Sequence, residues 1–172
     1  MQLREKDFSG KALFELAEKT RSLCDRYQAS LLINDRIDIA LAVDAAGVQL
    51  TSVSLPADVA RGLLGPQKLL GVSTHSLEEA RRAQQNGADF IVFGPVYFTP
   101  SKATFGAPQG LQALKKILEN TSLPVYAIGG IKAEHIADLR SLGVRGVALI
   151  SAIIGAARPE EAAANLIRLL TR

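Results

Sequence analysis

Short runs of β-branched and aliphatic residues alternate along the chain with longer segments whose apolar side chains recur every three to four positions. The runs predict strands, and the longer segments predict amphipathic helices. We expect strands at about 1–5, 30–34, 47–50, 69–73, 90–94, 124–128 and 146–150. We expect helices at about 10–27, 36–44, 56–64, 76–87, 108–120, 132–141 and 158–171. This strict alternation is typical of βα units around a parallel sheet.

Local signals mark several of the helix ends. Ser9 can cap the first helix, and Ser76 with Glu79 forms the pattern of a capping box. Gly87 and Gly143 fall where helices end, as expected for residues in the left-handed conformation.

The regular spacing of the units, about 20 residues for a strand and its helix, favours an α/β fold of the TIM (β/α) barrel class. A complete barrel has eight units, so seven strands and seven helices predict a barrel that lacks its first βα unit, or one whose true start lies upstream of Met1. An open doubly wound sheet is the alternative. It would hold seven strands without a deletion, but no Gly-x-Gly-x-x-Gly turn follows the first strand.

Composition and charge narrow the class of protein. The 172 residues, 48% of them apolar, are expected to form one domain over residues 1–172. With 20 basic and 17 acidic residues, no Trp and no dense basic run, a nucleic-acid partner is not expected. Cys24 is the only cysteine, and no apolar stretch is long enough to span a membrane, which together favour a cytoplasmic protein with no membrane partner.

In a barrel, the active site forms at the carboxyl ends of the strands. Gln2, Arg4 and Lys6 would share one face of the first strand, where two cations and an amide suit an anion. A solvated edge strand is the alternative interpretation.

Polar residues also end the second and fourth strands. The second strand ends in Asn34-Asp35, and the fourth ends in Ser73-Thr74. Asp35 can supply an oxygen to Mg²⁺ or act as a helix N-cap. His75 can lie beside Ser73, and His135 is expected on a helix surface, so neither predicts acid–base chemistry.

The loops after the last two strands resemble the phosphate sites of barrels. Gly129-Gly130 and Ser151-Ala152 can present backbone amides there, although glycines also permit tight turns. The longest loop carries Thr99-Pro100-Ser101-Lys102, whose lysine can close over a leaving phosphate. A solvated surface loop is the alternative.

These residues resemble the thiamine-phosphate synthase family, together with its barrel relative, the thiazole tautomerase. The resemblance covers nearly the whole chain. Its segments are Gln2-Leu3-Arg4-Glu5-Lys6, Leu32-Ile33-Asn34-Asp35-Arg36, Asp38-Ile39-Ala40-Leu41-Ala42, Gly71-Val72-Ser73-Thr74-His75-Ser76, Gly94-Pro95-Val96 with Thr99-Pro100-Ser101-Lys102, Ala127-Ile128-Gly129-Gly130-Ile131, and Ile150-Ser151-Ala152-Ile153.

The resemblance implies a transferase that joins an aminopyrimidine methyl diphosphate to a thiazole phosphate and releases diphosphate. It implies that the enzyme stabilises the departing diphosphate rather than moving a proton. The implied diphosphate ligands are Arg4, Lys6, Asn34, Ser73 and Lys102, of which Arg4, Lys6 and Lys102 are the catalytic ones, with Asp35 as a Mg²⁺ ligand. Gln2, Thr99 and Ser101 would border the organic substrates, and Gly129, Gly130, Ile150 and Ser151 would hold the thiazole phosphate.

The chain departs from the family pattern in one segment. The family usually reads Gly-Val-His-x-Gly-Gln-x-Asp where this chain has Gly47-Val48-Gln49-Leu50-Thr51-Ser52-Val53-Ser54, so Ser54 takes the place of a second metal carboxylate. This favours two alternatives: a tautomerase-like isomerase, or a non-catalytic homologue that binds phosphate ligands. The tautomerase branch is expected to have a histidine where this chain has Pro95. A homo-oligomer is also expected, because an open strand edge invites pairing.

Overall fold

The structure, a computed structural model, describes residues 1–100 and 106–171. The chain divides into two compact units. Unit 1 consists of Met1–Ser73 with Ala83–Asp89, and unit 2 of Thr74–Arg82 with Phe90–Arg172. Strands and helices alternate along both units, as predicted.

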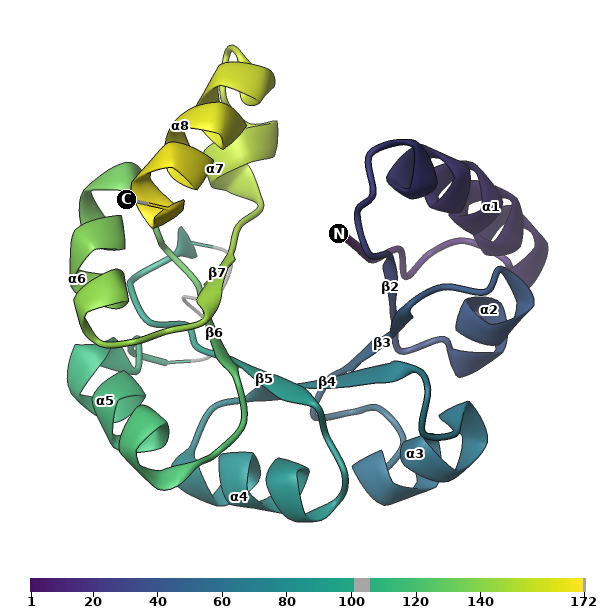
Figure 1. Cartoon of the computed structure of the whole chain (residues 1–172), viewed down its shortest axis with the longest axis horizontal. Helices are drawn as coiled ribbons and strands as arrows, with labels where there is room; N and C mark the ends of the chain where they lie inside the picture. Colours follow the sequence, from purple (N-terminus) through teal and green to yellow (C-terminus); the bar gives the residue numbers. More distant parts are fainter. Residues whose placement is uncertain (101–105, 172) are drawn as a thin grey trace. The chain divides into compact units, whose positions relative to one another are not determined.

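Unit 1 is built from consecutive βα units with a parallel sheet. Its elements are β1 (Gln2–Leu3), α1 (Gly10–Arg26), β2 (Leu32–Asn34), α2 (Ile37–Ala42), β3 (Gly47–Leu50), α3 (Ala57–Leu64) and β4 (Leu69–Thr74), of which Thr74 belongs to unit 2. Each strand pairs in parallel with the next in the sequence. The three helices lie on one side of these strands (Figure 1).

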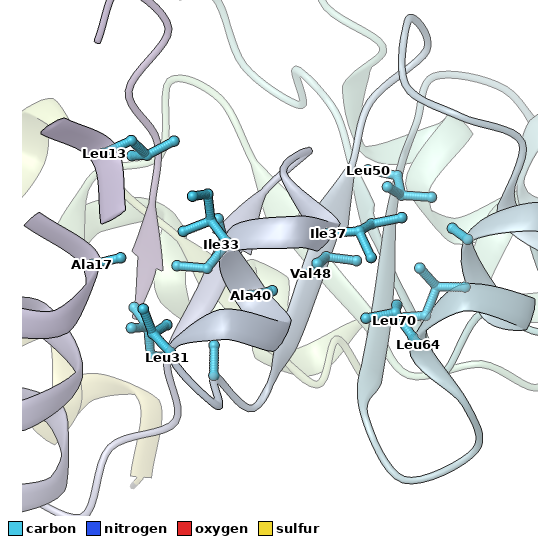
Figure 2. Close-up of a cluster of buried hydrophobic side chains, with 14 of the residues drawn as sticks. Leu13, Ala17, Leu31, Ile33, Ile37, Ala40, Val48, Leu50, Leu64 and Leu70 are labelled. Carbon is cyan, nitrogen blue, oxygen red and sulfur yellow. The ribbon is translucent and has the colours of Figure 1, made fainter. Parts of the chain in front are cut away.

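The apolar core of unit 1 fills the space between the strands and these helices. Figure 2 shows Ile33, Val48 and Leu70 from the strands among side chains of α1, α2 and α3. Because side chains alternate across a strand, Asn34, Gln49 and Ser73 project from the opposite face. The hydrophobic pattern therefore leaves one polar face on the sheet of unit 1.

Arg61 joins the end of α3 to a segment far along the chain. Its guanidinium donates to the carbonyl oxygens of Gly65 and Lys68, at 2.8 and 2.7 Å. It also donates to the carbonyl oxygen of Gly87, at 3.1 and 3.0 Å, and to the carboxylate of Asp89, at 2.6 Å. The Asp89 carboxylate in turn accepts from the Leu70 N–H, at 2.7 Å. Arg61 therefore ties the carboxyl end of α3 and the start of β4 to residues 83–89.

Unit 2 continues the same alternation. Its elements are the first part of α4 (Leu77–Gln85), then β5 (Phe90–Phe93), α5 (Gly110–Asn120), β6 (Val125–Ile128), the 3₁₀ helix η2 (Ala133–His135), α6 (Ile136–Ser141), β7 (Gly146–Ala148), α7 (Ser151–Ile154) and α8 (Pro159–Thr171). β5, β6 and β7 pair in parallel in sequence order.

The strand order separates the two fold classes considered above. A doubly wound sheet reverses its strand order and carries helices on both faces. Within each unit the strands instead follow the sequence order, and in unit 1 the helices cover a single face. This is the arrangement of consecutive βα units in a barrel.

Most predicted elements are present, with four differences. The first strand ends at Leu3 rather than at residue 5, and the seventh ends at Ala148 rather than at residue 150. The expected helix over 132–141 is divided into η2 and α6. The short helix α7 was not predicted, because its four residues are too few to show a helical pattern.

Most of the predicted helix ends are confirmed. The Ser9 hydroxyl accepts from the Ala12 N–H at 3.3 Å, and Gly87 and Gly143 have φ of 82° and 88°. The capping box is only half formed. Ser76 accepts from the Glu79 N–H at 3.1 Å, but the Glu79 carboxylate accepts from the His75 N–H, at 2.6 Å, rather than from Ser76. No helix among the described residues is both long and apolar enough to cross a membrane.

Candidate functional site

The polar face of unit 1 carries two hydrogen-bonded pairs of side chains. Gln2 Nε2 donates to Asn34 Oδ1 at 3.0 Å, and Gln49 Nε2 donates to Ser73 Oγ at 3.0 Å. Asn34 and Ser73 lie at the carboxyl ends of β2 and β4, where a barrel places its active site. Asn34 is 8% exposed and Gln49 is 3% exposed, so these bonds hold both amides in defined orientations. Gln2, Asn34 and Ser73 were predicted from the sequence as site residues, and Gln49 was not.

Arg4 and Lys6 lie beyond the end of β1. The expectation that they share a strand face with Gln2 is wrong, because β1 ends at Leu3 and the chain bends at Lys6. Both are exposed, and neither side chain has an ion-pair partner in the part of the chain that the structure describes. They follow the carboxyl end of β1, so two cations remain available there for an anion.

Asp35 follows β2 with a backbone conformation that is uncommon for residues other than glycine. Its φ is 65°, in the left-handed region, and its N–H donates to the Gln49 carbonyl oxygen at 3.0 Å. The alternative role as a helix N-cap is wrong, since α2 begins after Arg36 and has no side-chain cap. Arg36 instead pairs with Asp38 at 2.6 Å, which lowers the pKa of Asp38.

The donor set for a metal ion is small. Ser54 Oγ accepts from the Thr51 N–H at 2.8 Å and lies 3.0 Å from Thr51 Oγ1, so its hydroxyl is already used in a local turn. The described residues contain no group of three or more His, Cys, Asp or Glu that could hold a metal ion. Asp35 can supply one carboxylate, and Mg²⁺ commonly binds through one or two carboxylates plus phosphate oxygens. The residues therefore fit a Mg²⁺ ion that a phosphate ligand helps to hold.

In unit 2 the backbone rather than side chains defines the strand ends. The Val96 N–H donates to the Ile128 carbonyl oxygen at 2.9 Å, and the Tyr97 N–H donates to the Gly129 carbonyl oxygen at 3.0 Å. Gly129 and Gly130 have φ of 98° and 64°, and a Cβ on Gly130 would lie 2.3 Å from the Phe98 carbonyl oxygen. Close packing of this loop on the Gly-Gly turn therefore requires both glycines. Their part in binding phosphate stays a prediction.

His135 does not lie on a helix surface as expected. It ends η2, and its ring stacks on Tyr97 with centroids 3.8 Å apart and an angle of 10° between the planes. Its Nδ1 accepts from the Lys132 N–H at 3.1 Å. Burial, with a smaller contribution from Asp138, raises the pKa of the Tyr97 phenol. His75 Nδ1 contacts the Gly94 carbonyl oxygen. Both histidines thus have structural contacts.

The remaining predicted site residues lie at the start of α7 and in the segment after β5. Ile150 is 63% exposed and immediately precedes α7, which Ser151 begins. Thr99 is half-buried and has an interaction of its own. Ser101 and Lys102 lie outside the described residues.

Consecutive βα units with polar residues at the carboxyl ends of their strands define the class of a (β/α) barrel protein. The family model described as thiamine monophosphate synthase matches residues 1–153. The chain belongs to this family.

Individual relatives agree with the family. A putative thiamine-phosphate synthase of Geobacter sulfurreducens is 52% identical over 170 residues, which are 99% of this chain and 80% of the relative. The thiamine-phosphate synthase of Moorella thermoacetica is 44% identical over 172 residues, covering 100% of this chain and 82% of the relative. The solved structure of thiamine phosphate pyrophosphorylase from Pyrococcus furiosus matches with a TM-score of 0.91 and 38% identity, over 99% of this chain and 81% of that one.

A more distant structure supports the fold alone. The 3-hexulose-6-phosphate synthase of Salmonella typhimurium matches with a TM-score of 0.69 at 18% identity, over 90% of this chain and 80% of that one. Together with the Pyrococcus structure, it confirms the predicted barrel class.

Proposed function

We propose that this chain is a transferase that joins an aminopyrimidine methyl diphosphate to a thiazole phosphate, giving thiamine phosphate and diphosphate. The observation that carries the proposal is the pair of oriented polar groups, Asn34 and Ser73, at the strand ends of a chain that belongs to this family. Arg4 and Lys6 add two cations beside the end of β1.

The reaction needs stabilisation of charge rather than a general base. The bond between the pyrimidine methylene carbon and the diphosphate oxygen breaks, and its electron pair leaves with diphosphate. The thiazole nitrogen then supplies the electron pair of the new C–N bond. Arg4, Lys6 and Lys102 are proposed to neutralise the charge on the departing oxygens, while Asn34 and Ser73 donate hydrogen bonds to them. The structural roles of His75 and His135 are consistent with a reaction that needs no proton transfer.

Mg²⁺ is proposed as the cofactor, with Asp35 as its protein ligand. When bound, the ion would draw off negative charge from the diphosphate. Asp35 suits this role because its carboxylate makes no hydrogen bond or ion pair among the described residues. Ser54 would contribute little, since its hydroxyl is engaged with Thr51.

Unit 2 is proposed to bind the thiazole phosphate. The amides of Gly130 and Ile131 have no backbone hydrogen-bond partner among residues 1–100 and 106–171, which leaves them available to an anion. Gly129, Ile150 and Ser151 would complete this phosphate site by their places in the family motif. Gln2, Thr99 and Ser101 are proposed to border the organic parts of the substrates.

The direct test supplies both precursors with Mg²⁺ and measures thiamine phosphate. We expect product from the natural chain and its loss in Lys102→Ala. Lys115→Ala is a matched control, because Lys115 is exposed on α5 with only a weak contact to Glu119, at 3.9 Å. Folded protein that forms no product would contradict the proposal, and full activity in Lys102→Ala would contradict the role of that lysine.

The hydroxyl pair of Thr51 and Ser54 favours a second candidate, a non-catalytic homologue that binds phosphate ligands. Calorimetry with both substrates separates the two: binding without turnover, with Ser54→Asp gaining turnover, would support the second. A tautomerase-like isomerase is less well supported, because Pro95, joined to Gly94 by a cis peptide, has no group that could move a proton.

Three broader expectations accompany the proposal. The family match runs through both units, which supports a single catalytic domain. We expect a cytoplasmic enzyme, since its phosphorylated substrates do not cross membranes readily. The expected homo-oligomer is tested by mass measurement in solution, and a stable monomer would contradict it.

A further inference from the structure

Gln49 occupies a position whose usual family residue is histidine. It lies in β3, where its backbone is opposite Asn34 of β2 on one side and Gly71 of β4 on the other. At 3% exposure it is among the few polar side chains buried in the described chain. A buried amide in a sheet needs hydrogen-bond partners, so its contacts show what it does.

Gln49 reaches along the sheet to Ser73. The residue directly opposite, Gly71, has no side chain, and Ser73 lies two positions further on the same face of β4. The Gln49 side chain can therefore extend over Gly71 toward Ser73. Its Nε2 lies 3.0 Å from Ser73 Oγ.

A second contact determines which atom is the donor. The same Nε2 lies 3.4 Å from the carbonyl oxygen of Leu50, a group that can only accept hydrogen bonds. The amide must therefore present its NH₂ group rather than its oxygen. Both contacts use this group, so Ser73 Oγ accepts from Gln49.

The direction of this bond leaves the Ser73 proton available. A serine hydroxyl has one proton and two lone pairs. With a lone pair engaged by Gln49, the proton can point to an anion at the carboxyl end of β4. Asn34 is arranged in the same way, because its Oδ1 accepts from Gln2 and its NH₂ group remains as a donor.

We propose that Gln49 is a positioning residue that holds Ser73 as a hydrogen-bond donor toward the diphosphate. This inference rests on the proposed function, since it assumes that Ser73 binds the diphosphate. It predicts that the effects of Gln49 and Ser73 on binding are coupled. Removal of the Gln49 amide should weaken diphosphate binding only while the Ser73 hydroxyl is present.

The experiment measures the affinity of the full chain for inorganic pyrophosphate by calorimetry in the presence of Mg²⁺. We expect Ser73→Ala to weaken binding about tenfold, because a hydrogen bond to a charged group is lost. Gln49→Met, which is close in size but has no donor, should weaken it about three- to tenfold. The double variant should bind no worse than Ser73→Ala alone. Gln49→His restores a side-chain N–H and should bind within about threefold of the natural chain.

Two further outcomes separate the possible failures. If the natural chain binds no pyrophosphate, the diphosphate site itself is wrong, and this inference falls with the proposed function. If the natural chain binds but Gln49→Met is unchanged, or if the two losses multiply in the double variant, only the role of Gln49 is wrong. Should Gln49→Met fail to fold, Gln49→Asn tests the same bond, because it keeps the amide but is too short to reach Ser73.

Discussion

Unit 1 and unit 2 present their candidate ligand groups in different ways. In unit 1, side chains orient one another, as in the pairs Gln2 with Asn34 and Gln49 with Ser73. In unit 2, the turn at Gly129 and Gly130 is shaped by backbone hydrogen bonds to the loop at 96–98, and any side chain on Gly130 would collide with that loop.

Because of this difference, substitutions in the two places should affect different properties of the protein. A side chain in unit 1 can be replaced with a local effect on the ligand, because the sheet behind it is held by the apolar core. A substitution at the glycine turn of unit 2 changes the path of the backbone itself. We therefore expect substitutions of Gln2, Asn34, Gln49 and Ser73 in unit 1 to change mainly ligand affinity, and substitutions at the Gly129-Gly130 turn of unit 2 to change mainly stability.

The largest expected effect is that of Gly130→Ala. Its Cβ would lie 2.3 Å from the Phe98 carbonyl oxygen and 2.7 Å from that of Tyr97, at a φ of 64°. Neither carbonyl can move without breaking the contact of the loop with the turn. We expect a loss of about 3 kcal/mol or more in the free energy of unfolding, measured by chemical denaturation.

Two glycines without close neighbours serve as controls for that variant. Gly143 has a φ of 88° but nothing within 4 Å of its would-be Cβ, so Gly143→Ala should cost about 1 kcal/mol from backbone conformation alone. Gly62, inside α3, also has open space, and Gly62→Ala should stabilise the chain by about 0.5–1 kcal/mol. Equal losses at 130 and 143 would show that the collision with the loop is unimportant.

Arg4→Gln should have the largest effect on catalysis among the described residues of unit 1. We expect kcat/KM to fall about 100-fold, because a cation beside the diphosphate is lost. The melting temperature should not change, since Arg4 is exposed and has no ion pair among the described residues. Lys19→Gln, an exposed cation on α1, is the matched control. A similar loss in both variants would indicate general steering by charge rather than a contact.

Gln2→Met should have a smaller effect. It removes the bond that orients Asn34, so the Asn34 amide could turn its oxygen toward the anion. We expect a rise of about threefold in KM for the diphosphate substrate and a loss of at most about 1 kcal/mol in stability. Steady-state kinetics and a denaturation curve check both values. An unchanged KM would mean that Asn34 is oriented without Gln2.

The smallest expected effect is that of Asp38→Asn at the start of α2. Arg36 lowers the pKa of Asp38, so the pair stabilises the folded state above the ordinary pKa of an aspartate. This contribution is lost as the pH falls through the lowered pKa. Because the pair is largely exposed, we expect at most about 0.5 kcal/mol at neutral pH. The difference between the melting temperatures of the natural chain and the variant should shrink in acid, and a growing difference would contradict this sign.

The fold was predictable where the pattern of side chains is local. Runs such as Phe90-Ile91-Val92-Phe93 and Val125-Tyr126-Ala127-Ile128 are strands within about a residue of their predicted bounds. The end of β7 was not predictable in this way. Ile150 continues an apolar run, yet the chain turns into α7 there with an exposed isoleucine.

The residues of the candidate site, too, could be predicted only where the signal is local in the sequence. Asn34 and Ser73 could be named because each lies at the carboxyl end of a strand. Gln49 was missed because its contact with Ser73 depends on the register of β3 and β4 and on the absence of a side chain at Gly71, neither of which a single strand reveals. The role of His135 was misjudged for a similar reason, since its partner Tyr97 comes from a distant loop.

Arg61 has a consequence for the order in which the chain can fold. Three of its five hydrogen bonds go to Gly87 and Asp89, beyond the end of β4, so unit 1 is not a continuous segment. During synthesis, residues 1–73 would leave the ribosome with these three bonds still unmade. The carboxyl end of α3 would then stay loosely held until residues 87–89 arrive. A fragment that ends at Ser73 should accordingly be less stable than one extended to Asp89. The last contacts that stabilise unit 1 would therefore form only after part of unit 2 has been synthesised.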